Sequence, residues 1–282
     1  MHTKEEHNRL LHKIALLEDE LNAARGSMQN LQSIILSNIS HDVRTPMNAI
    51  VGFANLLTDE HMDPNDKNEC IDQINLNSIE LLEIIDNMID ASLLQCGDLK
   101  LYEKEFHLND LMDDLYQSSK ELLNARQKDL SLIVSKGEKD DFFLTADIKR
   151  LRQILTNLIN NAINFTPSGH IEFGYVKLDN EMIRFYVKDT GIGLGSVTSE
   201  DLFKPFRPRI MSEKCSFKKG AGLGLALSKN LVNIMGGDMW PESVPGEGTC
   251  FYFTLPVRKN SFLKNHLQQI SKITKRNIAS FF

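Results

Sequence analysis

The segment Ser37–Ile50, with the sequence SNISHDVRTPMNAI, decides the fold of the N-terminal part of the chain. Around it, apolar residues recur at steps of three and four, as on one face of a helix: Leu36, Ile39, Val43, Met47, Ile50, Ala54 and Leu57. At about 100° per residue, His41 lies roughly 200° from Ile39 and Val43, so its imidazole points away from that face. Most exposed histidine–aspartate pairs are ordinary surface, but His41 beside Asp42 also suits a nucleophile and its base. The pair therefore needs support from the rest of the chain.

A second helix is predicted after a turn at residues 58–66, where Pro64 and several Asn and Asp residues favour a new helix start. One face of it carries Ile71, Ile74, Ser78, Leu81, Leu82, Ile85, Met88, Ile89 and Ser92, and it ends at Gly97. Pro46 is expected to bend the first helix. A hairpin cannot bury a one-sided apolar stripe by itself, so residues 30–97 are predicted to form an α-helical hairpin that pairs into a dimeric four-helix bundle.

Residues 1–29 extend the helical pattern toward the N-terminus. Leucine and other apolar residues again step by three and four, with mixed charges on the flanks, so this segment is predicted to form a coiled-coil-like helix. The alternative is a single amphipathic helix packed on a domain. The coil is favoured because no strand-forming sequence precedes the segment.

The composition is that of a soluble globular protein with room for about two domains, with 41% hydrophobic and 25% charged residues among 282. The net charge of −6 argues against nucleic acid as a partner. Four cysteines form no Cys-x-x-Cys pair and are expected to be reduced thiols. Neither a membrane span nor a signal peptide is predicted, so we expect a cytoplasmic protein or the cytoplasmic portion of a membrane-anchored one.

From residue 98 the pattern changes to alternating strands and helices. Strands are predicted at 104–108, 130–134, 142–146, 170–178, 182–187 and 249–255, and helices at 109–127, 148–165 and 222–235. Because hairpins occur among crossover connections, residues 98–257 are predicted to form an α+β two-layer sandwich, a mixed sheet with helices on one face. Residues 258–282 form a basic amphipathic tail, expected to dock on the domain or begin a linker, with a membrane-surface role as the alternative.

Three groups of residues in the second domain could bind a nucleotide. Asn157 and Asn161 share one helix face, where carboxamide oxygens suit Mg²⁺, although surface asparagines are a simpler explanation. Asp189 ends an apolar strand, can accept a hydrogen bond from an exocyclic amine, and is followed by Gly191 and Gly193, which let the backbone approach a flat ring.

The third group is a glycine-rich helix start that suits an anion. Gly220, Gly222 and Gly224 open a helix whose free N–H groups and dipole favour a di- or triphosphate. Between Asp189 and this group lies a basic segment that includes Lys218 and Lys219, which is either an exposed loop without a role or a mobile lid over phosphates.

Taken together, these motifs resemble the catalytic core of the sensor histidine kinases of two-component systems. His41–Pro46 is similar to that family's His box, residues 157–166 to its Asn box, residues 189–193 and 220–224 to its two glycine boxes, and residues 202–206 to its Phe box. Their order and spacing match over about residues 30–257. The resemblance implies a His-containing dimerisation domain followed by a GHKL-type ATP-binding domain, and it makes the 1–29 helix a signalling helix.

The resemblance also implies a role for each matching residue. His41 would be the phosphoacceptor, Asp42 its base, and Thr45 the residue that orients water when a partner is dephosphorylated. Mg²⁺ would be held by Asn161 with the support of Asn157. The adenine of ATP would meet Asp189, Phe165 and, through water, Thr249, while Gly220–Gly224 would wrap the phosphates.

Implied partners are a second copy of the chain and the receiver domain of a response regulator, which accepts the phosphoryl group on an aspartate. Phosphatase activity toward that regulator is expected as well. Two positions depart from the family. Asn164 stands where a lysine is frequent, so a phosphate contact could move to Lys218 or Lys219, and Pro208 interrupts the Phe box.

The alternatives are a GHKL-fold ATPase or serine kinase, and a scaffold that binds nucleotide without catalysis. Related ATPases carry a glutamate that activates water where this chain has Asn157. Because an amide cannot act as a base, the site better suits transfer to a presented nucleophile.

Overall fold

The computed structural model describes residues 40, 42–59, 61–137, 142–178, 181–195, 198–204 and 222–257. The phosphoacceptor candidate His41, the predicted coil at 1–29, the glycine at 220 and the tail at 258–282 lie outside the described residues. The chain divides into two compact units, with the boundary between Met88 and Ile89. No helix among the described residues is both long enough and apolar enough to cross a bilayer.

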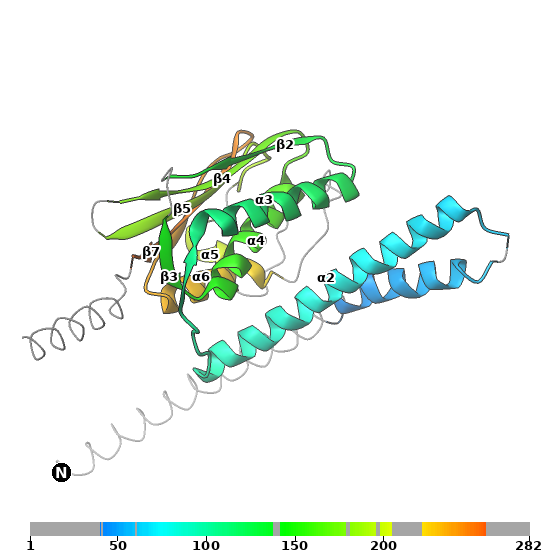
Figure 1. Ribbon diagram of the computed structural model, residues 1–282, viewed down its shortest axis with the longest axis horizontal. Coiled ribbons are helices and arrows are strands. Elements are labelled where there is room, and N and C mark those ends of the chain that lie inside the picture. Colours follow the sequence, from blue (N-terminus) through cyan, green and yellow to red (C-terminus); the bar gives the residue numbers. More distant parts are fainter. Residues whose placement is uncertain are drawn as a thin grey trace, which may run out of the picture. The chain divides into compact units, whose positions relative to one another are not determined.

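The first unit is built on a helical hairpin. A helix over residues 42–56 is followed by a short turn and by α2 (Pro64–Cys96), whose first 25 residues belong to this unit (Figure 1). Backbone bonds from Leu57, Thr58 and Asp59 close the end of the first helix, and Asp63 accepts a hydrogen bond from the Asn65 amide at the start of the second. The predicted hairpin is confirmed.

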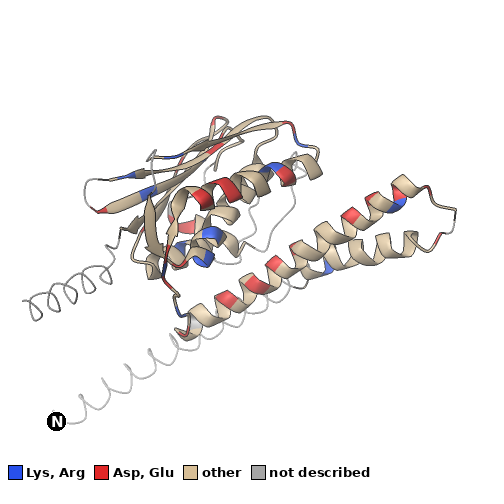
Figure 2. Cartoon of the chain, viewed as in Figure 1, with Lys and Arg blue, Asp and Glu red and all other residues tan. Residues whose placement is uncertain are grey.

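The hairpin leaves large apolar side chains exposed on a single chain. They recur on both helices and are Met47, Val51, Leu56, Ile71, Ile79, Leu82 and Ile85, each at least 40% exposed. Figure 2 shows acidic residues spaced along α2. An apolar stripe of this length needs a partner surface, as the sequence predicts for a four-helix bundle.

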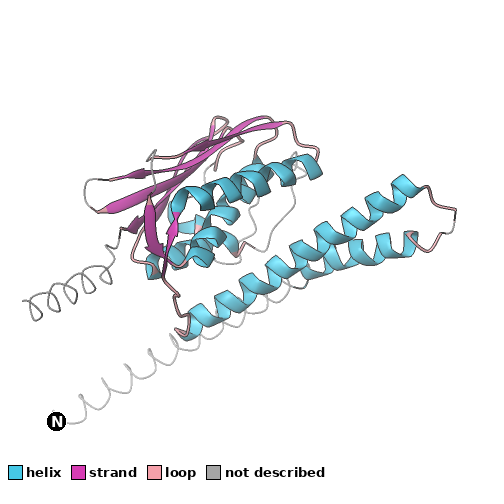
Figure 3. Cartoon of the chain, viewed as in Figure 1, coloured by secondary structure: helices cyan, strands magenta, loops and turns pink. Residues whose placement is uncertain are grey.

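The second unit is a two-layer sandwich of a mixed sheet and three long helices (Figure 3). The five-stranded sheet has the order β2-β4-β5-β7-β6, formed by β2 (Leu130–Ser135), β4 (Gly169–Lys177), β5 (Met182–Asp189), β7 (Gly248–Pro256) and β6 (Met239–Val244). Only the β2–β4 pair is parallel. The helices α3 (Leu108–Ala125), α4 (Ile148–Phe165) and α6 (Gly224–Ile234) cover one face, and α5 (Ser199–Leu202) is a single turn. The predicted α+β sandwich is confirmed.

Two details differ from the sequence prediction. The strands β1 (Lys104–His107) and β3 (Phe143–Ala146) pair with each other in a separate two-stranded sheet. The strand β6 was not predicted, because it contains Pro241 and follows Gly236 and Gly237, which are turn signals. Proline is tolerated there because β6 is an edge strand, where a missing N–H breaks no ladder.

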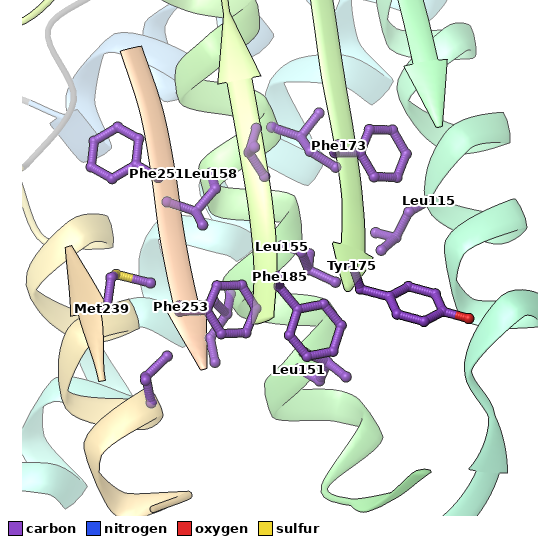
Figure 4. Close-up of a cluster of buried hydrophobic side chains, with 14 of the residues drawn as sticks. Leu115, Leu151, Leu155, Leu158, Phe173, Tyr175, Phe185, Met239, Phe251 and Phe253 are labelled. Atoms are coloured by element: carbon purple, nitrogen blue, oxygen red, sulfur yellow. The ribbon is translucent and has the colours of Figure 1, made fainter. Parts of the chain in front are cut away.

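The core lies between the sheet and the helices. Figure 4 shows the aromatic side chains of β4, β5 and β7 packed against leucines of α3 and α4. Phe185 stacks on Phe253 with a centroid distance of 4.7 Å, and Tyr175 donates a hydrogen bond of 2.8 Å to the buried Asn109 of α3. The same apolar face of α4 that fills this core leaves Asn157 and Asn161 on its other side, as predicted.

A buried ion pair ties the last turns of α2 to α4 within the second unit. Asp90 is only 7% exposed and accepts hydrogen bonds from Arg150 at 2.5 Å and from Gln153 at 2.8 Å. One turn of α4 therefore supplies both donors. The pair fixes the start of the helix that carries the Asn157–Asn161 face.

Replacing Asp90 by alanine is expected to lower the free energy of unfolding of the second unit by about 3 kcal/mol, because it leaves the Arg150 charge in a desolvated position without its partner. Urea unfolding followed by the fluorescence of Trp240, the single tryptophan, measures this. Asp113→Ala is the matched control: it breaks an exposed pair with Lys136 and is expected to cost less than about 1 kcal/mol. Equal effects of the two variants would contradict the structural role of Asp90.

Candidate nucleotide-binding site

The two asparagines of α4 have different surroundings. The Asn157 amide donates a hydrogen bond of 2.9 Å to the Ser228 hydroxyl of α6. A Cβ atom at Gly224 would overlap the Asn157 side-chain oxygen, so a larger residue there would force the Asn157 carboxamide to move. Asn157 thus positions the helix that follows the second glycine box. Asn161 is half-buried one turn further along the same face.

The loop after Asp189 is held against the end of α4. The Ile192 amide donates to the Phe165 carbonyl at 3.3 Å, and a Cβ atom at Gly191 would collide with that same carbonyl. Gly193 has a φ of +73°, which a residue with a side chain rarely adopts. The predicted need for glycine at these two positions therefore has a steric and a conformational cause. The loop brings Phe165 next to the Asp189–Gly193 segment.

Asp189 is the centre of this arrangement. It is 6% exposed, and its Oδ1 accepts hydrogen bonds from the backbone amides of Gly191 at 2.8 Å and Thr249 at 3.3 Å. Asp189 and Thr249 lie directly opposite each other in the antiparallel β5–β7 pair, so their side chains share the inner face of the sheet. A buried carboxylate held by backbone donors is an acceptor fixed in place, which fits the amino group of a base.

Ser243 of β6 completes the same end of the site, and sequence reasoning missed it. Its hydroxyl contacts the Leu194 amide at 2.9 Å, the Gly248 carbonyl at 2.8 Å and the Thr249 hydroxyl at 3.1 Å. A serine in an unpredicted edge strand gave no signal of its own. Only the hairpin register between β6 and β7, which pairs Ser243 with Thr249, places it there.

The Asn164 side chain forms a hydrogen bond with a cationic residue from a distant part of the sequence. Arg126, which follows α3, donates a hydrogen bond of 2.7 Å to the Asn164 carboxamide. Nearby, the Lys128 ammonium caps the end of α4 by donating to the carbonyls of Ile163 and Thr166. Burial, and secondarily the neighbouring charge of Arg126, lowers the pKa of Lys128. The Asn164 side chain, which stands where the resemblance leads one to expect a lysine, thus binds an arginine, a contact that the sequence spacing could not predict.

The described part of the chain accordingly brings together Asn157, Asn161, Phe165, Asp189, Gly191, Gly193, Gly224 and Thr249 in the second unit. The first unit holds Asp42 and Thr45 on its first helix. The candidates His41, Lys218, Lys219 and Gly220 lie outside the described residues. Gly222 is described, with a φ of +67°.

No cluster of three His, Cys, Asp or Glu side chains that could hold a metal ion occurs among the described residues. Asn161 is the protein ligand that the sequence offers for Mg²⁺, which takes much of its coordination from phosphates and water. A half-buried carboxamide on a helix facing the glycine-rich helix start fits that chemistry. Asn157 does not, because Ser228 and Gly224 occupy its surroundings.

Comparison with known families accounts for both units. Residues 31–97 match the sequence model of the His Kinase A (phospho-acceptor) domain, and residues 146–259 match that of the histidine kinase-, DNA gyrase B- and HSP90-like ATPases. The chain belongs to the two-component sensor histidine kinases. In this histidine kinase the two matched regions coincide with the helical hairpin and with most of the α+β sandwich.

Several of the similar proteins are named as sensors or sensor kinases. The chain is similar to the sensor protein GacS of Pseudomonas syringae pv. syringae, with 36% identity over 257 residues that cover 88% of this chain and 28% of GacS. It is also similar to the autoinducer 2 sensor kinase/phosphatase LuxQ of Vibrio parahaemolyticus, with 34% identity over 230 residues, covering 79% of this chain and 26% of LuxQ. The chain thus spans little more than a quarter of the length of these relatives.

Solved structures agree with the fold. Full-length ShkA in complex with AMPPNP matches with a TM-score of 0.55 and 26% identity, covering 78% of this chain and 45% of ShkA. The Acinetobacter baumannii histidine kinase AdeS matches with the same TM-score at 20% identity over 78% of this chain and 98% of AdeS, a likeness of fold alone.

Proposed function

We propose that this chain is an ATP- and Mg²⁺-dependent protein-histidine kinase that phosphorylates His41 and passes the phosphoryl group to an aspartate of a response-regulator receiver domain. The observation that carries the proposal is the presence in one chain of a phosphoacceptor-domain match and an ATPase-domain match, the latter containing the buried Asp189 site. ATP binding is supported by the ATPase family itself and by the AMPPNP complex of the related ShkA.

The reaction proceeds by in-line displacement. A nitrogen of the His41 imidazole attacks the γ-phosphorus of ATP, the bond from that phosphorus to the bridging oxygen breaks, and ADP leaves with the electron pair. Asp42 takes the proton from the other ring nitrogen or holds the resulting charge. When Mg²⁺ is bound, it neutralises phosphate charge; Asn161 is the residue that would hold it.

The site disfavours simple hydrolysis. Asn157 is an amide bound to Ser228 and packed on Gly224, so it neither accepts a proton from water nor is free to turn toward it. This favours the kinase over an ATPase of the same fold. The hairpin, with its exposed apolar stripe, further supports a homodimer in which two copies complete a four-helix bundle.

The chemistry of the label tests the proposal. After incubation of the full chain with Mg²⁺ and ATP labelled at the γ-phosphate, we expect a protein-bound phosphoramidate that is lost in acid and survives base. A label with the opposite behaviour would indicate a serine kinase. Nucleotide binding with no label under any condition would indicate a scaffold, and either result would contradict the proposal.

Thr45→Ala is expected to separate autophosphorylation from the dephosphorylation of a partner receiver domain. Thr45 lies one turn after His41 on an exposed helix position, where its hydroxyl can orient water toward a phosphoaspartate on the partner. We expect autophosphorylation to persist and dephosphorylation of a phosphorylated receiver domain to slow by about 100-fold or more, the usual range for one proton-transfer group. Thr58→Ala, in the turn that follows the same helix, is the control, and a phosphatase rate unchanged in Thr45→Ala would refute the role.

A further inference from the structure

The Ser243 hydroxyl contacts three polar groups at the end of the site that contains Asp189. Its oxygen lies 2.8 Å from the Gly248 carbonyl, 2.9 Å from the Leu194 amide nitrogen and 3.1 Å from the Thr249 hydroxyl. These groups come from the loop after Asp189 and from the first two residues of β7. The Ser243 side chain of β6 therefore connects the loop after Asp189 with the start of β7.

The direction of each hydrogen bond follows from the number of protons available. A serine hydroxyl has one proton and two lone pairs. The Gly248 carbonyl can only accept, so the Ser243 hydroxyl donates its proton to that carbonyl. The Leu194 amide can only donate, so it occupies one lone pair of the Ser243 oxygen. The remaining lone pair makes a hydrogen bond with Thr249 only if the Thr249 hydroxyl donates. The Thr249 proton is thus directed at Ser243.

Because its proton is directed at Ser243, the Thr249 hydroxyl can only accept hydrogen bonds from other groups. Thr249 lies opposite Asp189 in the β5–β7 register, and both are 6% exposed. Asp189 is itself an acceptor, since its carboxylate is fixed by two backbone amides. The buried end of the site therefore presents acceptors from two adjacent strands. Such a surface suits an amino group, directly or through one water, and opposes a carbonyl oxygen, which would face like dipoles.

We propose that Ser243 is a positioning residue that fixes the Thr249 hydroxyl as an acceptor and thereby favours a base with an amino group over one with a carbonyl at the same ring position. The inference rests on the proposed binding of ATP by this site and adds a residue that sets its base selectivity. Ser243 does so without needing to touch the nucleotide.

The test compares ADP with IDP, which carries a carbonyl in place of the adenine amine, by calorimetry on the full chain. In Ser243→Ala the Thr249 proton is released and can turn toward the base. We expect ADP affinity to fall about three- to tenfold, the range for one hydrogen bond, and the preference for ADP over IDP to narrow by a similar factor. Thr254→Val removes another hydroxyl of β7, one that accepts from the Asp238 amide, and should leave that preference unchanged.

A double-mutant cycle separates positioning from general loosening of the hairpin. If Ser243 acts through Thr249, adding Ser243→Ala to Thr249→Val should not narrow the preference further. Two results would overturn the inference while leaving ATP binding intact. One is a Ser243→Ala variant whose ratio of ADP affinity to IDP affinity equals that of the wild type. The other is a Ser243→Ala substitution that narrows this ratio as much in the Thr249→Val background as in the wild type. Failure of the wild-type chain to bind ADP would overturn the proposed function and the inference with it.

Discussion

Replacing Asp189 by asparagine is expected to weaken ADP binding about 100-fold while leaving the second unit folded. The carboxylate is buried, and it holds the amides of Gly191 and Thr249 as an acceptor. Asparagine can keep one acceptor but brings an NH₂ group to the place where the base amine donates. A hydrogen bond to a charged group contributes about 1.5–3 kcal/mol, and two facing donors add a desolvation cost, so a total near 3 kcal/mol is expected.

Calorimetric titration with ADP measures the effect, and Asp238→Asn provides the matched control. Asp238 is an exposed carboxylate paired with Lys229, and it also accepts from a backbone amide. The hydrogen bond from Lys229 lowers the pKa of Asp238, yet the residue lies outside the Asp189 arrangement. Its variant should bind ADP as the wild type does. Retention of wild-type affinity by Asp189→Asn would mean that the base does not bind at Asp189.

Gly248→Ala is expected to destabilise the second unit by about 3 kcal/mol and to abolish measurable ADP binding with it. Gly248 has a φ of +120°, a region that L-residues with side chains rarely adopt. In addition, a Cβ atom there would overlap the Asp189 carbonyl oxygen and crowd the Thr190 Cα. Because all of these contacts are with backbone, no side chain can move aside. The β5–β7 pairing that joins Asp189 to Thr249 must open instead.

A neighbouring glycine separates conformational strain from steric overlap. Gly246 lies in the same turn with a φ of +83°, but a Cβ atom there meets nothing within 4 Å. Gly246→Ala should therefore lower the free energy of unfolding only by the strain of the left-handed conformation, about 1–2 kcal/mol. We expect this variant to keep ADP binding. Urea unfolding followed by Trp240 fluorescence compares the two variants. Similar losses of stability in both would show that the overlap with Asp189 has no energetic consequence.

Periodicity predicted the helices and the fold class because apolar spacing is a local property of the chain. The 3.6-residue repeat located α2, α3, α4 and α6, and the buried face of α4 placed Asn157 and Asn161 on the opposite side. The glycines at 191 and 193 were predicted from their position after a strand, and the overlap with the Phe165 carbonyl explains the first of them.

What the sequence could not predict depends on contacts between distant segments. Ser243 reaches Thr249 only through the β6–β7 hairpin, and β6 itself was missed because Pro241 argues against a strand anywhere except at an edge. Arg126 reaches Asn164 across 38 positions, and Asp90 reaches Arg150 across 60. Charged residues of ordinary composition give no local signal of such partners.

The site of phosphorylation tests the central claim most directly. After reaction with Mg²⁺ and ATP, the full chain is digested under neutral conditions and the modified peptide is located by mass spectrometry, with His41→Gln and His61→Gln as paired variants of the hairpin. We predict a single phosphohistidine at residue 41 that is absent from His41→Gln and retained in His61→Gln. A phosphoryl group that persists in His41→Gln would contradict the account.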